Sequence, residues 1–258
     1  MIDGKVTIQR VETEKKKYRV YTGQGDFLFS EDTVIKYGLF KDKTFTAEEF
    51  SEILAAEEYQ KLFNKVLRYL SYQERSVKEV ETYLNKQSGD SAAIIKIIDK
   101  FIAYGYLNDA RYAALTLNYV LTSRKGPRYL ENRLQLKGVS AELINETLEK
   151  YSEEQEKSLV DEIVQDYINK NSEQPKLKLQ ARLYQKLIRD GFSVDIVTQT
   201  IANTKFPSVS RQKLRLDLSK LLLKIPEQTT EAKQKIIKKM IAKGYSYHDV
   251  VNVLSENE

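Results

Sequence analysis

The clearest apolar pattern in the chain lies at residues 67–87, LRYLSYQERSVKEVETYLNKQ. Apolar positions recur there at i, i+3, i+6 and i+7, which places one stripe along a helix: Val77, Val80, Tyr83 and Leu84. Ser76 and Glu79 form an S-x-x-E capping box at the start of the stripe, in which each side chain satisfies a free backbone amide. The pattern predicts an amphipathic helix that begins at Ser76 and ends before Gly89.

Similar helix endings recur along the chain. The glycines that close them are separated by 49, 53 and 53 residues: Gly89, Gly138, Gly191 and Gly244. This spacing indicates an internal repeat, and three helices fit into each unit. A unit of this size buries little core alone, so we expect neighbouring units to stack. We therefore predict a mainly α chain of tandem three-helix repeats in an elongated, curved array, at residues 58–107, 108–152, 153–205 and 206–258.

Two turns mark helix boundaries in the first half of these repeats. In Gly105-Tyr106-Leu107-Asn108-Asp109, the glycine suits a left-handed helix end, and either Asn108 or Asp109 caps the next helix. In Lys125-Gly126-Pro127, the proline suits the first position of a helix. The short turns between second and third helices also resemble those of helix-turn-helix DNA readers. The third helices are apolar or acidic, however, which favours packing over DNA reading.

The first 57 residues differ from the rest. Alternating apolar and polar positions from Lys5 to Phe29 predict an antiparallel sheet of about three strands. Ser30 is expected to cap a short helix that ends at Gly38. A second helix is expected after Thr46, with Glu49 completing a capping box and a hydrophobic staple between the flanking phenylalanines, Phe45 and Phe50. Residues 1–57 are thus predicted to form a separate α+β cap.

Charge is unevenly distributed in this chain, which has a net charge of +5 and a pI near 9.0. Residues 58–137 carry +6 and residues 205–258 carry +5, whereas residues 1–57 carry −2 and residues 138–204 carry −4. Two basic zones suit a polyanion, which they would bind through phosphate contacts and counterion release. The simpler interpretation of the charge alone is a solvated helical surface.

The chain has few sequence features that are typical of a catalytic site. There is no cysteine and a single histidine, His248, so thiol chemistry and cysteine zinc sites are excluded. None of the common phosphate-loop, hydrolase or metalloprotease motifs occurs. No apolar run approaches the ~20 residues that span a bilayer. We expect a cytoplasmic, non-enzymatic protein, monomeric, with no cofactor, metal or membrane partner.

The basic residues of 58–137 are the best candidates for a functional surface. They surround the capping box and the Lys-Gly-Pro turn: Arg68, Arg75, Lys78, Arg111, Arg124, Lys125, Arg128 and Arg133. Tyrosines are interleaved with them: Tyr69, Tyr72, Tyr83, Tyr104, Tyr106, Tyr112, Tyr119 and Tyr129. Aromatic rings among cations suit base stacking or a wet protein interface, but tyrosines at helical spacing also fill cores.

Three of these segments together resemble the RecX family of regulators of the RecA recombinase: LRYLSYQERSVKEVETYL, FIAYGYLNDARYAALTL and RKGPRYLENRLQLKGVSAELI. The resemblance covers about residues 60–205, and the N-terminal strands and fourth repeat resemble the longer form of low-GC Gram-positive bacteria. Gln73 departs from the pattern, because members often have arginine there. The resemblance implies three-helix repeats that bind the RecA–DNA filament, limit its growth and lower its activities, with weak contact to single- or double-stranded DNA.

A rival hypothesis is a helical-repeat protein that binds single-stranded nucleic acid directly, without a recombinase partner. A third is a helical scaffold with neither role. The salt dependence of DNA affinity separates the first two, because phosphate binding weakens steeply as salt rises.

Overall fold

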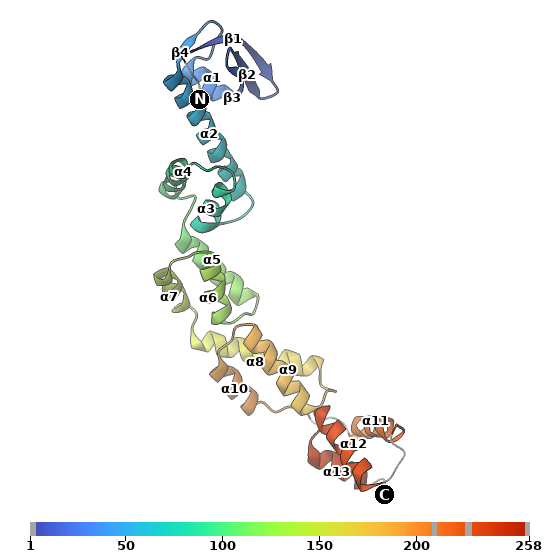
Figure 1. Cartoon of the computed structure of the whole chain (residues 1–258). Coiled ribbons are helices and arrows are strands. Elements are labelled where there is room, and N and C mark those ends of the chain that lie inside the picture. The colour runs from blue at the N-terminus through green and yellow to red at the C-terminus, as the bar shows by residue number, and fades with distance from the viewer. Residues whose placement is uncertain (1–3, 208–210, 225–228, 256–258) are drawn as a thin grey trace. The chain divides into compact units, whose positions relative to one another are not determined.

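The computed structural model describes residues 4–207, 211–224 and 229–255, which contain 13 helices and one four-stranded sheet (Figure 1). The chain divides into two compact units, residues 1–112 and residues 113–258. The prediction of a mainly helical chain, built of three-helix groups after a small N-terminal sheet, is confirmed.

An antiparallel sheet opens the first unit, with strand order β3-β2-β1-β4. Its strands are β1 (Lys5–Glu14), β2 (Lys17–Thr22), β3 (Gly25–Ser30) and β4 (Thr44–Thr46). The sheet therefore has four strands, one more than the predicted number of about three. β4 has only three residues, too few for alternation to reveal, and it exists because Phe45 pairs with Val6 of β1. Helix α1 (Glu31–Tyr37) follows Ser30, as predicted, and ends at Gly38 in the left-handed conformation.

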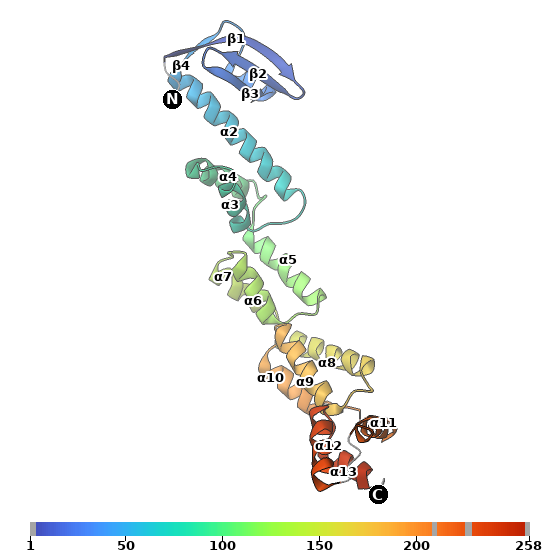
Figure 2. The ribbon, with the colours of Figure 1, turned by 45° about the vertical axis from the view of Figure 1, so that its right-hand side comes forward.

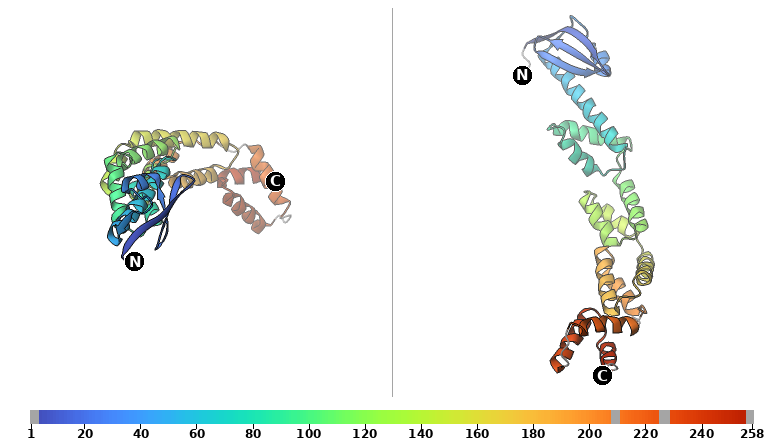
Figure 3. Two further views of the ribbon diagram at one scale, coloured as in Figure 1. Left: turned by 90° about the horizontal axis from the view of Figure 1, so that it is seen from above. Right: turned by 90° about the vertical axis from the view of Figure 1, so that its right-hand side faces the viewer.

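Helix α2 (Ala47–Leu70) leaves the sheet as one uninterrupted helix (Figure 3, right). The predicted capping box of Thr46 and Glu49 is present at its start. Its N-terminal half packs into the core of the sheet, and its C-terminal half packs into the first repeat. Glu57 lies between these halves, buried, and accepts hydrogen bonds from Ser30 and Thr33 at the start of α1. The proposed domain boundary at residues 57 and 58 therefore falls inside a helix.

The first repeat continues with α3 (Val77–Asn85) and α4 (Ser91–Ala103). The capping box of Ser76 and Glu79 is confirmed, and Val80 and Leu84 are fully buried. Gly89, however, does not close α3 in a left-handed conformation, in contrast to the glycines that end later helices. The helix ends at Asn85 with Lys86 as its right-handed cap, and Gly89 lies in the following turn, directly before Asp90, which caps α4.

Helix α5 (Asp109–Thr122) begins at the end of the first unit, and the second unit contains the remaining helices: α6 (Pro127–Leu136), α7 (Ala141–Leu148), α8 (Glu153–Lys170), α9 (Lys176–Arg189), α10 (Val194–Asn203), α11 (Arg211–Leu222), α12 (Thr230–Ala242) and α13 (Tyr247–Ser255). Helices α8, α9 and α10 pack against one another around a common core (Figure 2). Gly138, Gly191 and Gly244 all have positive φ, as predicted for helix ends. From the sequence, two helices of the fourth repeat are also predicted to begin at residues 208 and 228, and both positions lie outside the described residues.

From the sequence, a serine is predicted to open the third helix of each later repeat, and in α10 this serine has a different role. Ser193 occupies the N-cap position, but its side chain caps no backbone amide of α10. Its hydroxyl instead donates to the carboxylate of Glu156, a buried residue of α8 that also accepts from the Ser193 amide. Glu156 thus fastens the start of α10 to α8.

In the part of the chain that the structure describes, no helix is long and apolar enough to cross a membrane.

Candidate interaction surface

Arg75 lies directly before the capping box of α3. Its guanidinium stacks over the ring of Tyr69 at 4.3 Å and lies 3.5 Å from the carboxylate of Glu79. Tyr69 in turn stacks face to face on Tyr83, with ring centroids 4.3 Å apart. The side-chain amide of Gln73 faces the same guanidinium. Because its side chain is only 19% exposed, Arg75 mainly holds the start of α3 together.

Two further candidates lie near this cap, and both are exposed. Lys78 forms an ion pair with Glu81 at 2.7 Å, one turn along α3. Arg68, in the last turn of α2, has no side-chain ion pair among the described residues. Exposed pairs such as that of Lys78 contribute little stability and are easily exchanged for an external anion.

The Gly105–Asp109 turn is built by three polar side chains, two of which were expected to compete for one role. Asn108 caps α5 by accepting from the Arg111 amide at 2.9 Å. Asp109 accepts instead from the Val77 amide at the start of α3, at 2.9 Å, and its partial burial raises the pKa of that carboxyl. Asp109 therefore links two helix starts of the first unit.

Arg111 closes the same turn from outside. Its guanidinium donates to the carbonyl oxygens of Gly105 and Tyr106, just after the end of α4, and forms an ion pair with Glu74 at 3.0 Å. Cations at a helix C-terminus are favoured by the helix dipole. The guanidinium nitrogens of Arg111 thus stabilise the fold, and a partner would need the same atoms.

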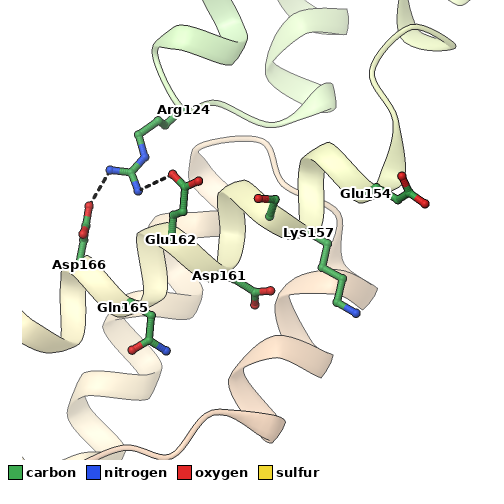
Figure 4. Close-up of a pocket in the computed structure, with 8 residues that line it drawn as sticks. Arg124, Glu154, Lys157, Asp161, Glu162, Gln165 and Asp166 are labelled. Carbon is green, nitrogen blue, oxygen red and sulfur yellow. Dashed lines mark hydrogen bonds and ion pairs between the residues drawn. The ribbon is translucent and has the colours of Figure 1, made fainter.

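Arg124, in the second unit, is neutralised by helix α8. Its guanidinium lies 2.7 Å from Asp166 and 3.5 Å from Glu162 (Figure 4). The hydrogen bond from Arg124 lowers the pKa of Asp166. These residues line an open hollow of about 720 Å³, along which α8 also exposes Glu154 and Asp161. This side of α8 is acidic, and Arg124 is held by it.

The Lys-Gly-Pro turn is a junction between the second and third repeats. The Lys125 ammonium lies 2.6 Å from the Asp190 carboxylate, and the Gly126 amide donates to the Asp190 carbonyl oxygen at 2.9 Å. Burial disfavours ionisation of Asp190, but the hydrogen bonds from Lys125 and Lys186 outweigh it and lower the pKa of this carboxyl. A Cβ on Gly126 would lie 2.3 Å from the Gly191 backbone, so no other residue fits without a shift.

This junction recurs one repeat later. Gly191 packs against the backbone of Tyr129, the third residue of α6, and Gly244 packs against the backbone of Lys178, the third residue of α9. In each case the glycine follows the middle helix of one repeat and approaches the first turn of the middle helix of the preceding repeat. The glycines found by their spacing therefore serve the contact between repeats as well as the helix end.

The last two candidates both lie in α6 but differ in their contacts. Arg128 is exposed, and its side chain has no ion-pair partner within the described ranges; its backbone amide donates to Gly191 at 3.0 Å. Arg133 stacks on the ring of Tyr119 at 4.7 Å. Of the eight candidates, Arg68 and Arg128 are thus the ones that are both exposed and outside any ion pair or ring contact among the described residues.

The tyrosines divide between the two roles considered for them. Tyr112 is buried, whereas four are largely exposed: Tyr72, Tyr104, Tyr106 and Tyr119. His248 is exposed and lies 3.0 Å from the Asn252 amide, and no group of metal-binding side chains occurs among the residues that the structure describes.

Sequence reasoning placed the candidate surface in 58–137 and missed how much of its charge is paired. It gave no residue of the fourth repeat, where the described segments 211–224 and 229–255 carry 10 Lys/Arg against 3 Asp/Glu. The available signal was the run KQKIIKKM, in which lysines lack acidic neighbours toward the helix C-terminus.

Comparisons with known proteins agree with this architecture. Two family models match, the first three-helix domain of RecX at residues 63–101 and the second at residues 108–148. The regulatory protein RecX of Listeria monocytogenes serotype 4a is 31% identical, over 96% of this chain and 94% of its own length. That of Streptococcus uberis is 29% identical, over 96% and 98%.

Two solved structures are also similar. A crystal structure of RecX from Lactobacillus salivarius is 30% identical, covers 57% of this chain and 96% of its own, and has a TM-score of 0.52. A second crystal structure of regulatory protein RecX, 22% identical, covers 77% of this chain and all of its own, with a TM-score of 0.59, and supports the fold alone. With near-complete coverage of relatives at 30% identity and both domain models in order, this chain belongs to the RecX family of regulatory proteins.

Proposed function

We propose that this protein regulates the RecA recombinase in the cytoplasm by binding the RecA–DNA filament as a monomer and limiting its growth and activities. The observation that carries the proposal is the match of both RecX domain models to the first two repeats, within a likeness that spans nearly the whole chain. The protein acts by occupying a surface, without catalysis of its own.

The charges of the first two repeats decide which residues a test should change. Arg75, Arg111 and Arg124 are engaged with acids of their own unit, so their replacement would disturb the fold as well as any partner contact. Arg68 and Arg128 are exposed and outside ion pairs in the described chain, so their charge is available to a partner. These two arginines are the contacts that we propose for the filament.

The test is a titration of the protein into RecA filaments assembled on single-stranded DNA, read by the rate of ATP hydrolysis. We expect the wild-type protein to lower the rate and R68E/R128E to need at least about tenfold more protein, because each reversal removes an attraction of about 1 kcal/mol and adds a repulsion. Circular dichroism checks that the helical content is unchanged.

The matched control is K15E/K41E, which makes the same charge change at exposed lysines of the N-terminal sheet region. It should inhibit like the wild type. Inhibition by R68E/R128E at wild-type concentrations would remove these arginines from the contact, and absence of any inhibition by the wild-type protein would refute the proposed function.

A further inference from the structure

The fourth repeat carries an excess of positive charge that its own acids do not balance. Its described segments contain three acidic residues. Asp217 accepts a hydrogen bond from Tyr245 at 2.7 Å, and Asp249 accepts one from Ser246 at 2.6 Å. Two of the three carboxylates thus serve the packing of this repeat, and the third, Glu231, lies in the first turn of α12.

Three of these positive charges share one face of α12. Lys235, Lys238 and Lys239 are exposed, and none forms an ion pair with a residue that the structure describes. They stand at i, i+3 and i+4, so their side chains share a face, and the rise from first to last is about 6 Å. The opposite face of α12 is anchored in the core by Ile236 and Met240. The three ammonium groups are therefore presented together on a well-packed helix.

This arrangement has a cost within the isolated protein. Like charges three and four residues apart on a helix disfavour it by about 0.2–0.5 kcal/mol per pair. The dipole of α12 offsets part of this cost, because Lys239 lies in its last turn. An anion outside the repeat removes the repulsion and gains the attraction of all three charges.

We propose that this lysine face of α12, defined by Lys235, Lys238 and Lys239, binds the phosphate backbone of DNA. Double-stranded DNA carries one negative charge per about 1.7 Å of its axis, so a row of cations about 6 Å long meets several phosphates at once. The face has the charge for phosphates but no array of side chains for reading bases, which indicates binding without sequence preference. The choice of DNA as the polyanion rests on the proposed function. The inference that this face binds an anion rests only on its three lysines.

The contrast with the second repeat supports this assignment. Arg124 and Lys125, the most basic point of the sequence-predicted surface, are paired with Asp166 and Asp190. Binding of phosphate there requires breaking those pairs. The lysine face requires no such exchange among the described residues, so it is the more favourable place for a polyanion.

The experiment measures binding of the full chain to fluorescent DNA, as a single strand and a duplex of about 20 nucleotides or base pairs, between 50 and 200 mM salt. Counterion release predicts that K235Q/K238Q/K239Q lowers the slope of log affinity against log salt by about 2.7 for the duplex and about 2 for the single strand. At 0.1 M salt the same relation, taken from 1 M, predicts about 500-fold weaker duplex binding. K15Q/K16Q/K41Q, with the same charge change on exposed lysines of the sheet region, should bind like the wild type.

Unchanged affinity and slope in the α12 variant, with the helical signal intact, would overturn the proposal. So would loss of binding to phosphatidylserine vesicles in that variant while DNA binding persists, since the face would then recognise a membrane surface. Inhibition of RecA is measured separately on preformed filaments. A variant that loses naked-DNA binding but still inhibits supports both proposals, and a wild type that binds DNA but never inhibits refutes the proposed function alone.

Discussion

Replacement of Gly126 by alanine tests the junction between the second and third repeats. Gly126 has φ −84° and ψ 172°, a conformation open to any residue, so the substitution strains no local backbone. The new Cβ would lie 2.3 Å from the carbonyl carbon and oxygen of Gly191 and 2.4 Å from the amide nitrogen of Phe192. Since these are backbone atoms, relief requires that the two repeats move apart by about 1 Å to reach ordinary contact.

The expected loss of stability follows from the hydrogen bonds that this movement breaks. The bonds from Gly126 to Asp190 and from Arg128 to Gly191, at 2.9 and 3.0 Å, would each lengthen beyond hydrogen-bonding distance. Each is worth about 0.5–1.5 kcal/mol, and overpacking alone costs about 1–3 kcal/mol. We expect G126A to lose about 2–6 kcal/mol of stability in the second unit, with a melting temperature lower by at least about 4 °C.

The assay is thermal unfolding by circular dichroism together with hydrogen exchange of the Gly126 and Arg128 amides. Because repeats couple through their interfaces, a weakened junction should also broaden or split the transition. The matched control is G89A, whose added Cβ meets nothing within 4 Å and whose φ is not positive; it should unfold like the wild type. G126A with an unchanged melting temperature and unchanged protection would refute the close approach.

Two carboxylates give further predictions. The pKa of Asp190 is lowered in the fold, so its pairing stabilises above the ordinary value near 3.9 and is lost as pH falls through the folded value. In urea titrations D190N should therefore have a lower free energy of unfolding than the wild type at pH 7. Its free energy of unfolding should also fall less than that of the wild type between about pH 5 and 3, and an equal fall in both proteins would contradict this. The pKa of Asp109 is raised by burial, so its charge costs stability as pH rises through the folded value. D109N, which keeps an acceptor for the Val77 amide, should match or exceed the wild type at pH 7, whereas D109A should lose about 1 kcal/mol with its cap; equal urea midpoints for both variants would exclude a capping role.

Helix boundaries were the most predictable part of the fold, because they depend on neighbours in the sequence. Ser76 with Glu79 and Thr46 with Glu49 formed their capping boxes, and Pro127 opened α6. Two of the failures came where a distant residue decided the outcome. Strand β4 needs β1 to exist, and the hydroxyl of Ser193 turns from its own helix to Glu156, 37 residues away.

The candidate surface was less predictable than the fold for the same reason. A basic residue can be counted in the sequence, but whether its charge is available depends on acids brought near by folding. Arg124 meets Asp166 across 42 residues, and Lys125 meets Asp190 across 65. Both looked like partner contacts in sequence, and both are engaged within their own unit.

The sequence by itself determined the helices, the period of the repeat and, through its motifs, the family. These follow from local spacing, since apolar stripes, caps and glycine helix ends are read from residues within a few positions of one another. Only the tertiary structure decided that Gly126 and Gly191 meet backbone to backbone, and which lysines and arginines remain unpaired in the described chain. Charge pairing and close approach are set by distances in space, and residues 40 to 65 positions apart acquire such distances only when the repeats pack.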